Sequence, residues 1–205
     1  MTTFDESFRS AEQEAFRFLG SAHGFCVVER EVARAGSLQG VVGHVVYQSP
    51  GSPQGLARAV RLTIVPLRLQ LDLQVSRTTS AAYAIEELHA LDGHGLFPAR
   101  EHGLYDAMHN PGELLAEFTR LAGVLRACGT RFFNDEPDLW DDLDAQRGRR
   151  NEDEAIRRTL ALSKELFRAR DWLGVVELLG PIEFRLGSNA SARLAYAKRK
   201  MREGP

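Results

Sequence analysis

The chain has 205 residues, a mass of 22.8 kDa and a formal net charge of −2 at pH 7. This length fits one or two domains, and the apolar content excludes a disordered or fibrous chain. Because basic and acidic residues nearly balance, we expect no general nucleic-acid binding. No stretch of the sequence is apolar enough for a membrane span, and the first residues do not resemble a signal peptide. We therefore expect a cytoplasmic protein, with Cys26 and Cys128 as reduced core thiols.

The first predicted element is an amphipathic helix at residues 4–19. Charged residues separate its apolar positions, and Gly20 follows where a helix commonly ends. We therefore expect one aromatic-rich face of this helix to be buried. The apolar residues recur at intervals of three and four: Phe4, Phe8, Ala11, Ala15, Phe18 and Leu19.

Residues 24–77 show a period of two instead, which predicts antiparallel strands. In the last strand Leu71, Leu73 and Val75 alternate with polar residues, so one face should be buried and the other in water. Pro66 cannot donate a ladder hydrogen bond and is expected in a short turn before this strand. The four predicted strands span residues 24–33, 41–48, 57–65 and 67–77.

The periodicity weakens over residues 78–110, where we expect a long connection. Within it, residues 81–91 could form one short helix or a last strand. Asn110, followed by proline and by Glu113 at the third helical position, is typical of a helix start. That helix should end at Cys128, because glycine follows.

Further helices are predicted in the last third of the chain. Asn151 and Asp171 are expected to cap two of them, and another should span about residues 190–201. The pair over residues 152–179 resembles one helical hairpin of the tetratricopeptide kind. A single hairpin does not make a repeat array, because solenoids need about three repeats to bury a continuous core.

Together these elements predict an α+β protein. An N-terminal helix should pack on a four-stranded antiparallel sheet, and a helical C-terminal half should follow. We expect residues 1–110 to form the sheet region and residues 111–205 the helical region, with one shared core.

A histidine-rich segment suggests one enzymatic alternative, a metal-dependent enzyme. Histidine and carboxylate side chains are suitable metal ligands, but the gaps of five, eight and seven residues do not match the closely spaced pairs of zinc sites. We favour a polar loop without metal or cofactor. The sequence also contains no nucleophile or phosphate-binding motif, so no catalytic residue is assigned. The segment comprises His89, His94, His102 and His109 with Asp92, Glu101 and Asp106.

An acidic segment at residues 135–144 holds six acidic residues and no basic one. Two interpretations are open. In the first, Trp140 packs inward and the acidic side chains face solvent on a helix turn. In the second, the acidic side chains surround Trp140, which serves as an aromatic anchor for a basic protein surface. If the segment does not bind, the exposed sheet face with Arg61, Thr63, Gln70 and Asp72 is the next candidate. The predicted partner-binding residues are Asp135, Glu136, Asp138, Trp140, Asp141 and Asp142.

Several stretches resemble a loose set of bacterial α+β proteins of the toxin-immunity type. They are FRFLGSAHGFCVVEREV, GHVVYQSPG, AVRLTIVPLRLQLDLQV and LAEFTRLAGVLRACGTRFFNDEPDLWDDL, within about residues 10–143. The resemblance implies a protein that binds and neutralises a cognate toxin, and it assigns no individual site residue.

The leading hypothesis is therefore a non-enzymatic protein-binding module, specifically an immunity-type inhibitor. Its expected partner is a protein such as a basic toxin domain, with neither nucleic acid nor membrane. The alternatives are the metal-dependent enzyme and an adaptor protein that uses the helical hairpin. A toxin-like reading frame beside this one would distinguish them.

Overall fold

The computed structural model describes residues 4–32, 43–51, 57–65, 70–77, 82–99 and 110–203. The chain forms two compact units, residues 1–144 and residues 145–205. This division falls later than the predicted one after residue 110, because the helix that begins at Pro111 shares the hydrophobic core of the sheet.

The first unit confirms the predicted α+β class. Helix α1 (Phe4–His23) precedes an antiparallel sheet in which consecutive strands are neighbours. A fifth strand, β5 (Tyr83–Ala84), pairs with β4 and leads directly into helix α2 (Ile85–Leu91), so the segment expected to form either a helix or a strand forms both. The turn predicted at Pro66 lies outside the described residues. The four predicted strands are present: β1 (Cys26–Glu31), β2 (Gly43–Gln48), β3 (Arg58–Val65) and β4 (Gln70–Arg77).

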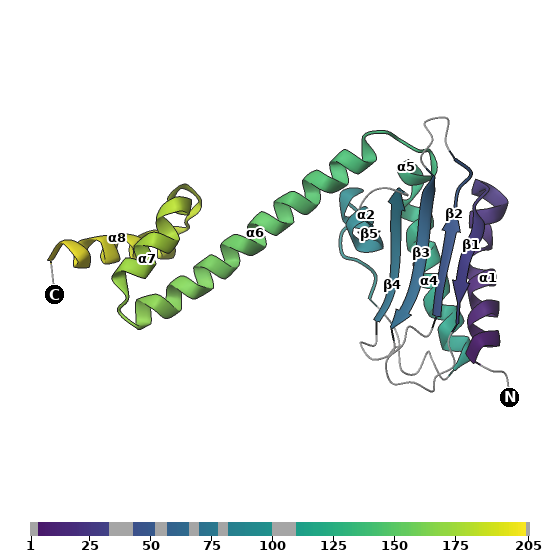
Figure 1. The fold of residues 1–205 in the computed structure, drawn as a ribbon, viewed down its shortest axis with the longest axis horizontal. Helices are drawn as coiled ribbons and strands as arrows, with labels where there is room; N and C mark the ends of the chain where they lie inside the picture. The colour runs from purple at the N-terminus through teal and green to yellow at the C-terminus, as the bar shows by residue number, and fades with distance from the viewer. Residues whose placement is uncertain are drawn as a thin grey trace. The chain divides into compact units, whose positions relative to one another are not determined.

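One face of the sheet carries the core of this unit. Leu71 and Leu73 on β4 are 4% and 1% exposed, as their alternation predicted. Helix α4 (Pro111–Cys128) packs with α1 on this face, and α4 lies behind the strands in Figure 1. The two helices meet through Phe8 and Phe118, whose ring centroids are 5.4 Å apart in an edge-to-face arrangement.

The helix ends show where local sequence decides the structure. Asn110 caps α4 as predicted, because its side-chain oxygen accepts a hydrogen bond of 3.0 Å from the N–H of Gly112. The end of α1 was predicted at Gly20, but the helix continues to His23. Gly24 then adopts a φ of +70° and donates its N–H to the carbonyl of Gly20 at 3.1 Å.

The two cysteines lie in different environments. Cys26 is exposed, so its expected place in the core is wrong; it lies on β1, an edge strand most of whose side chains are exposed. Cys128 is buried at the end of α4, as predicted. Burial raises the pKa of the Cys128 thiol to about 12, so this thiol stays protonated at neutral pH.

Glu12 is a carboxylate buried within the first unit. Its side chain is 0% exposed and accepts hydrogen bonds from the Tyr47 hydroxyl and, at 2.7 Å, from the Arg30 guanidinium. These contacts tie α1 to β1 and β2. Burial raises the pKa of Glu12, and the charge of Arg30 opposes that rise.

The short helix α5 (Thr130–Phe133) leads to α6 (Leu139–Arg168), which begins well before the predicted cap. The cap predicted at Asn151 is therefore wrong. Leu139 and Leu143 are each 1% exposed and fix the first turns of α6 in the core of the first unit. The arginines and glutamates that follow have good helix propensity and continue the helix into the second unit.

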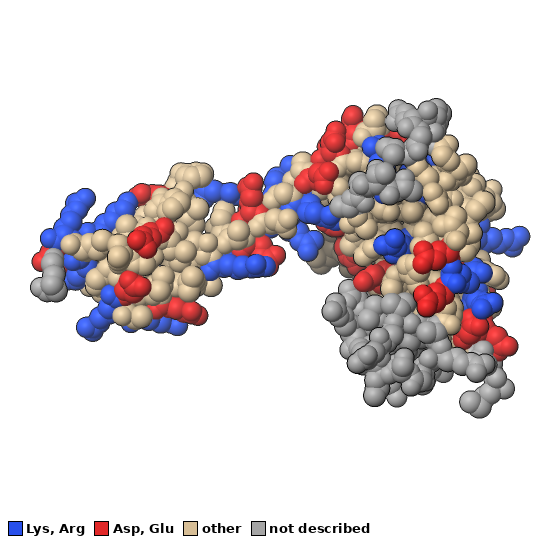
Figure 2. All heavy atoms as spheres, in the orientation of Figure 1, with Lys and Arg blue, Asp and Glu red and all other residues tan. Residues whose placement is uncertain are grey.

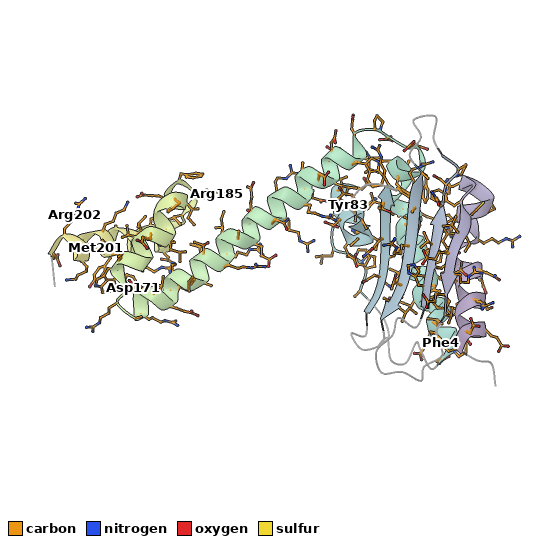
Figure 3. All side chains as sticks on the ribbon, viewed as in Figure 1. Phe4, Tyr83, Asp171, Arg185, Met201 and Arg202 are labelled. Carbon is orange, nitrogen blue, oxygen red and sulfur yellow. The ribbon has the colours of Figure 1, made fainter. Side chains whose placement is uncertain are left out.

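The second unit consists of the rest of α6, helix α7 (Trp172–Leu179), the 3-10 helix η2 (Gly180–Arg185) and α8 (Ser188–Glu203). Asp171 caps α7 as predicted, accepting a hydrogen bond of 2.9 Å from the N–H of Gly174, and it lies at the turn between α6 and α7 (Figure 3). The buried residues of its core are Val175, Leu179, Leu194 and Ala197.

Candidate protein-binding surfaces

Asp135 and Arg58 fix the start of the acidic segment. Asp135 has a φ of 55°, which places it in the left-handed region directly after α5. The Arg58 guanidinium donates to the carbonyls of Phe132 and Phe133 at 2.5 and 2.6 Å and lies 3.8 Å from a carboxylate oxygen of Asp135. Asp135 therefore helps to hold the end of α5 against β3, and its charge is compensated within the protein.

Arg131 compensates two more acids of the segment. Its guanidinium binds Glu136 at 3.0 Å and Asp142 at 2.7 Å. The hydrogen bond to Asp142 is the main reason that the pKa of Arg131 is raised. Asp138 and Asp141 are exposed, and among the described residues no ion pair involves either of them. Acidic side chains gather at the start of α6 in Figure 2.

Trp140 is 5% exposed, so it cannot serve as an exposed anchor and belongs to the core. Its ring lies 5.8 Å from that of Tyr83 and 6.1 Å from that of Phe132. The Arg77 guanidinium lies 5.1 Å from the Trp140 ring centroid. Of the two interpretations of the segment, the structure agrees with the one in which Trp140 packs inward. Of the predicted residues, the structure brings Glu136 and Asp142 together through Arg131 and places Trp140 in the core.

Tyr83 connects this aromatic cluster to the end of the acidic segment. Its hydroxyl donates a hydrogen bond of 2.6 Å to Asp144, and Figure 3 labels Tyr83 on β5. This hydrogen bond was not predictable, because residues 83 and 144 are far apart in the sequence and meet only through the fold.

The second candidate surface is the face of the sheet opposite α1 and α4, which we call the open face. The strands are antiparallel and in regular register from β2 to β4, so their outward side chains form rows across the sheet. One row contains Glu29, Val46, Arg61 and Gln74, and the next contains Glu31, His44, Thr63 and Asp72. The strands face the viewer in Figure 1, so this face is the visible one.

His44 links three strands on the open face. Its Nδ1 lies 3.1 Å from the hydroxyl of Thr63 on β3, and its Nε2 lies 3.5 Å from a carboxylate oxygen of Glu29 on β1. The Glu29 side chain is 60% exposed. These contacts fix polar groups on a rigid sheet, which suits recognition of a partner by hydrogen bonds and charge. Sequence reasoning identified Arg61, Thr63 and Asp72 here but missed Glu29 and His44, because only the register places them beside Thr63.

The histidines of the metal alternative are only partly within the described residues. His89 is 6% exposed and packs against the rings of His94 and Phe97, at centroid distances of 5.4 and 5.3 Å. His102 and His109 lie outside the described residues. In the described part of the chain, no group of three or more His, Cys, Asp or Glu side chains could hold a metal ion.

No family model matches the sequence, and the searches of curated proteins and of solved structures found no match. The resemblance to immunity proteins therefore stays a prediction. Among the described helices, none is long and apolar enough to cross a membrane.

Proposed function

We propose that the chain is a cytoplasmic protein-binding module whose first unit binds a basic protein surface, as an immunity-type inhibitor of a cognate bacterial toxin does. The observation that carries this proposal is the acidic first unit with its open sheet face. Residues 1–144 contain 12 basic and 20 acidic residues, a net charge of −8, and no lysine. Such a charge accelerates encounter with a basic partner and disfavours acidic ones.

The charge is distributed over two surfaces of this unit. Asp138 and Asp141 leave their charge uncompensated at the start of α6, while Glu29 and Glu31 lie at the edge of the open face. Further from that edge, the rows of the open face contain uncharged side chains such as Val46 and Thr63. A central area of moderate polarity with a charged rim is typical of a non-obligate protein interface.

The test begins with a search for a toxin-like reading frame beside this gene. Binding of its purified product is then measured as association and dissociation rates over a range of salt concentrations. Asp138→Asn with Asp141→Asn should slow association and flatten its salt dependence, because steering charges act mainly on the association rate. Growth of cells that express the candidate, with and without this protein, then shows whether binding neutralises it.

A matched pair of substitutions tests the open face itself. Gln74→Arg adds bulk and positive charge to the open face, and it should weaken binding about tenfold or more. Gln13→Arg makes the same change on the exposed side of α1 and should leave the affinity within about twofold. A partner whose binding is unaffected by Gln74→Arg and by the Asp138/Asp141 change contradicts the proposal.

A further inference from the structure

The second unit contains a depression along one face of α6. The residues that line it recur at intervals of three and four between Gln146 and Ala161, so they share one side of the helix. Lys and Arg side chains project along α6 in Figure 2. The charged residues of the depression are Arg149, Arg150, Asp153, Glu154, Arg157 and Arg158.

The two acids of the depression are already compensated. Arg185, labelled in Figure 3, lies 3.3 Å from a carboxylate oxygen of Asp153, and Arg158 pairs with Glu154 one turn away. The pKa of Glu154 is lowered, first by its hydrogen bond to Arg158 and further by the charges of Arg150 and Arg157.

Three arginines of the depression are left without a compensating charge. Arg149, Arg150 and Arg157 are exposed, and the described residues show no ion pair for any of them. Arg149, Arg150 and Arg157 lie on the same side of α6, because all three line the depression at helical intervals. The depression therefore carries an excess of positive charge.

The charge of the whole unit has the same sign. Residues 145–205 contain 14 basic and eight acidic residues, a net charge of +6. The whole-chain charge of −2 conceals this value, because the first unit carries the acidic excess. The expectation of no general nucleic-acid binding rested on that whole-chain balance.

The lining chemistry distinguishes between anionic partners. Protein interfaces draw much of their affinity from aromatic side chains in well-packed pockets, but Ala161 is the one apolar side chain that lines the depression. A phosphate backbone needs no such anchor, and the planar guanidinium fork matches phosphate oxygens. The pairs Arg149/Arg150 and Arg157/Arg158 are eight positions apart, or about 12 Å along the helix, similar to the width of the B-DNA major groove.

We infer that this face of α6 binds the phosphate backbone of duplex DNA without sequence preference. The inference does not depend on the proposed function, because it uses residues of the second unit alone. Contacts to both strands across the major groove would involve charge and not base edges, so affinity should fall steeply with salt.

The test uses the full-length protein and a short fluorescein-labelled DNA duplex of mixed sequence, with anisotropy measured over a series of KCl concentrations. Changing Arg149, Arg150 and Arg157 together to Gln should weaken binding at low salt by at least about tenfold. The slope of log affinity against log salt should fall by about 2–3. All three positions are exposed, so the variant should fold, and circular dichroism is the check.

The control removes the same charge from the same unit. Lys164, Arg168 and Arg202 are also exposed and lie outside the depression; changing all three to Gln should leave most of the affinity. An equal loss in both triple variants overturns the inference, since it shows that the attraction is diffuse. Equal binding of labelled polyglutamate overturns it as well, because an acidic protein is then the better partner, and so does the absence of duplex binding at low salt.

Discussion

The two units are held together in different ways. In the first, a sheet and two helices enclose an extensive core rich in aromatic side chains, and several charged groups, such as Arg58 and Glu12, lie largely within it. In the second, four buried side chains form the centre of the core, and the ion pairs are largely exposed. The net charges are opposite, −8 and +6. A property averaged over the chain therefore describes neither unit, and substitutions should act on one unit at a time.

The largest effect is expected for Trp140→Ala in the first unit. The substitution removes a 5% exposed ring that packs against Tyr83 and Phe132. The loss of burial and the cavity left behind should lower the free energy of unfolding by about 3–5 kcal/mol. Urea denaturation followed by circular dichroism measures this change.

The control for Trp140→Ala is its exposed neighbour. Asp141→Ala should change the free energy of unfolding by less than about 0.5 kcal/mol. An unchanged denaturation midpoint for Trp140→Ala contradicts the core position and restores the tryptophan as an exposed anchor.

A smaller effect is expected for Leu179→Ala in the second unit. Leu179 is fully buried, but its surroundings are partly exposed side chains that can move into the space, so we expect a loss of about 2–3 kcal/mol. The chain has two tryptophans, so in a Trp140→Phe background the fluorescence of Trp172 reports on the second unit. Leu173→Ala, at a position 54% exposed, is the matched control. Equal losses at both positions mean that this unit has no specific core.

The buried carboxylate of the first unit gives a pH-dependent prediction. Because burial raises the pKa of Glu12 in the folded protein, the folded state holds the Glu12 proton more tightly than the unfolded chain does. The stability that this group contributes is complete below the ordinary glutamate pKa and is lost as pH rises through the raised value.

The side chain introduced by Glu12→Gln cannot ionise and retains polar contacts to Tyr47 and Arg30. The variant should therefore not lose this stability as pH rises. The difference in unfolding free energy between Glu12→Gln and the unsubstituted protein should thus move in favour of the variant as pH rises from about 4 to 7. Glu14→Gln, on the exposed side of the same helix, should show no such trend. A trend of the opposite sign means that the ion pair with Arg30 outweighs burial.

Sequence patterns predicted those elements whose causes are local. The alternation of Leu71, Leu73 and Val75 identified the buried face of β4, and the side chains of Asn110 and Asp171 cap their helices. These features depend only on residues close together in the sequence, so the sequence pattern is sufficient to predict them.

Features that depend on distant residues were missed. The start of α6 follows from docking of Leu139 and Leu143 into a core built mainly from earlier residues. The contact of His44 with Thr63 requires the strand register. The net charge of the second unit depends on the division after residue 144, because the acidic first unit offsets it in the charge of the whole chain.

The smallest effect on stability is expected for Arg185→Gln. Arg185 lies 3.2 Å from Glu152 and 3.3 Å from Asp153, but its side chain is 37% exposed and both carboxylates are more exposed still. Water screens such pairs, so the substitution should lower the free energy of unfolding of the second unit by less than about 1 kcal/mol. Trp172 fluorescence in the Trp140→Phe background measures this loss, which should shrink further in high salt.

The same substitution separates stability from surface charge. Without Arg185, Asp153 lies uncompensated within the depression on α6. Arg185→Gln should therefore weaken duplex binding at low salt several-fold, although Arg185 does not line the depression. The control is Arg168→Gln, which removes one exposed charge of the unit without leaving a carboxylate of the depression unpaired. Arg193→Gln is not suitable, because Arg193 donates a hydrogen bond of 2.8 Å to the buried Ser163. A loss of stability above about 2 kcal/mol for Arg185→Gln contradicts the view that the small apolar core, and not the exposed ion pairs, holds the second unit together.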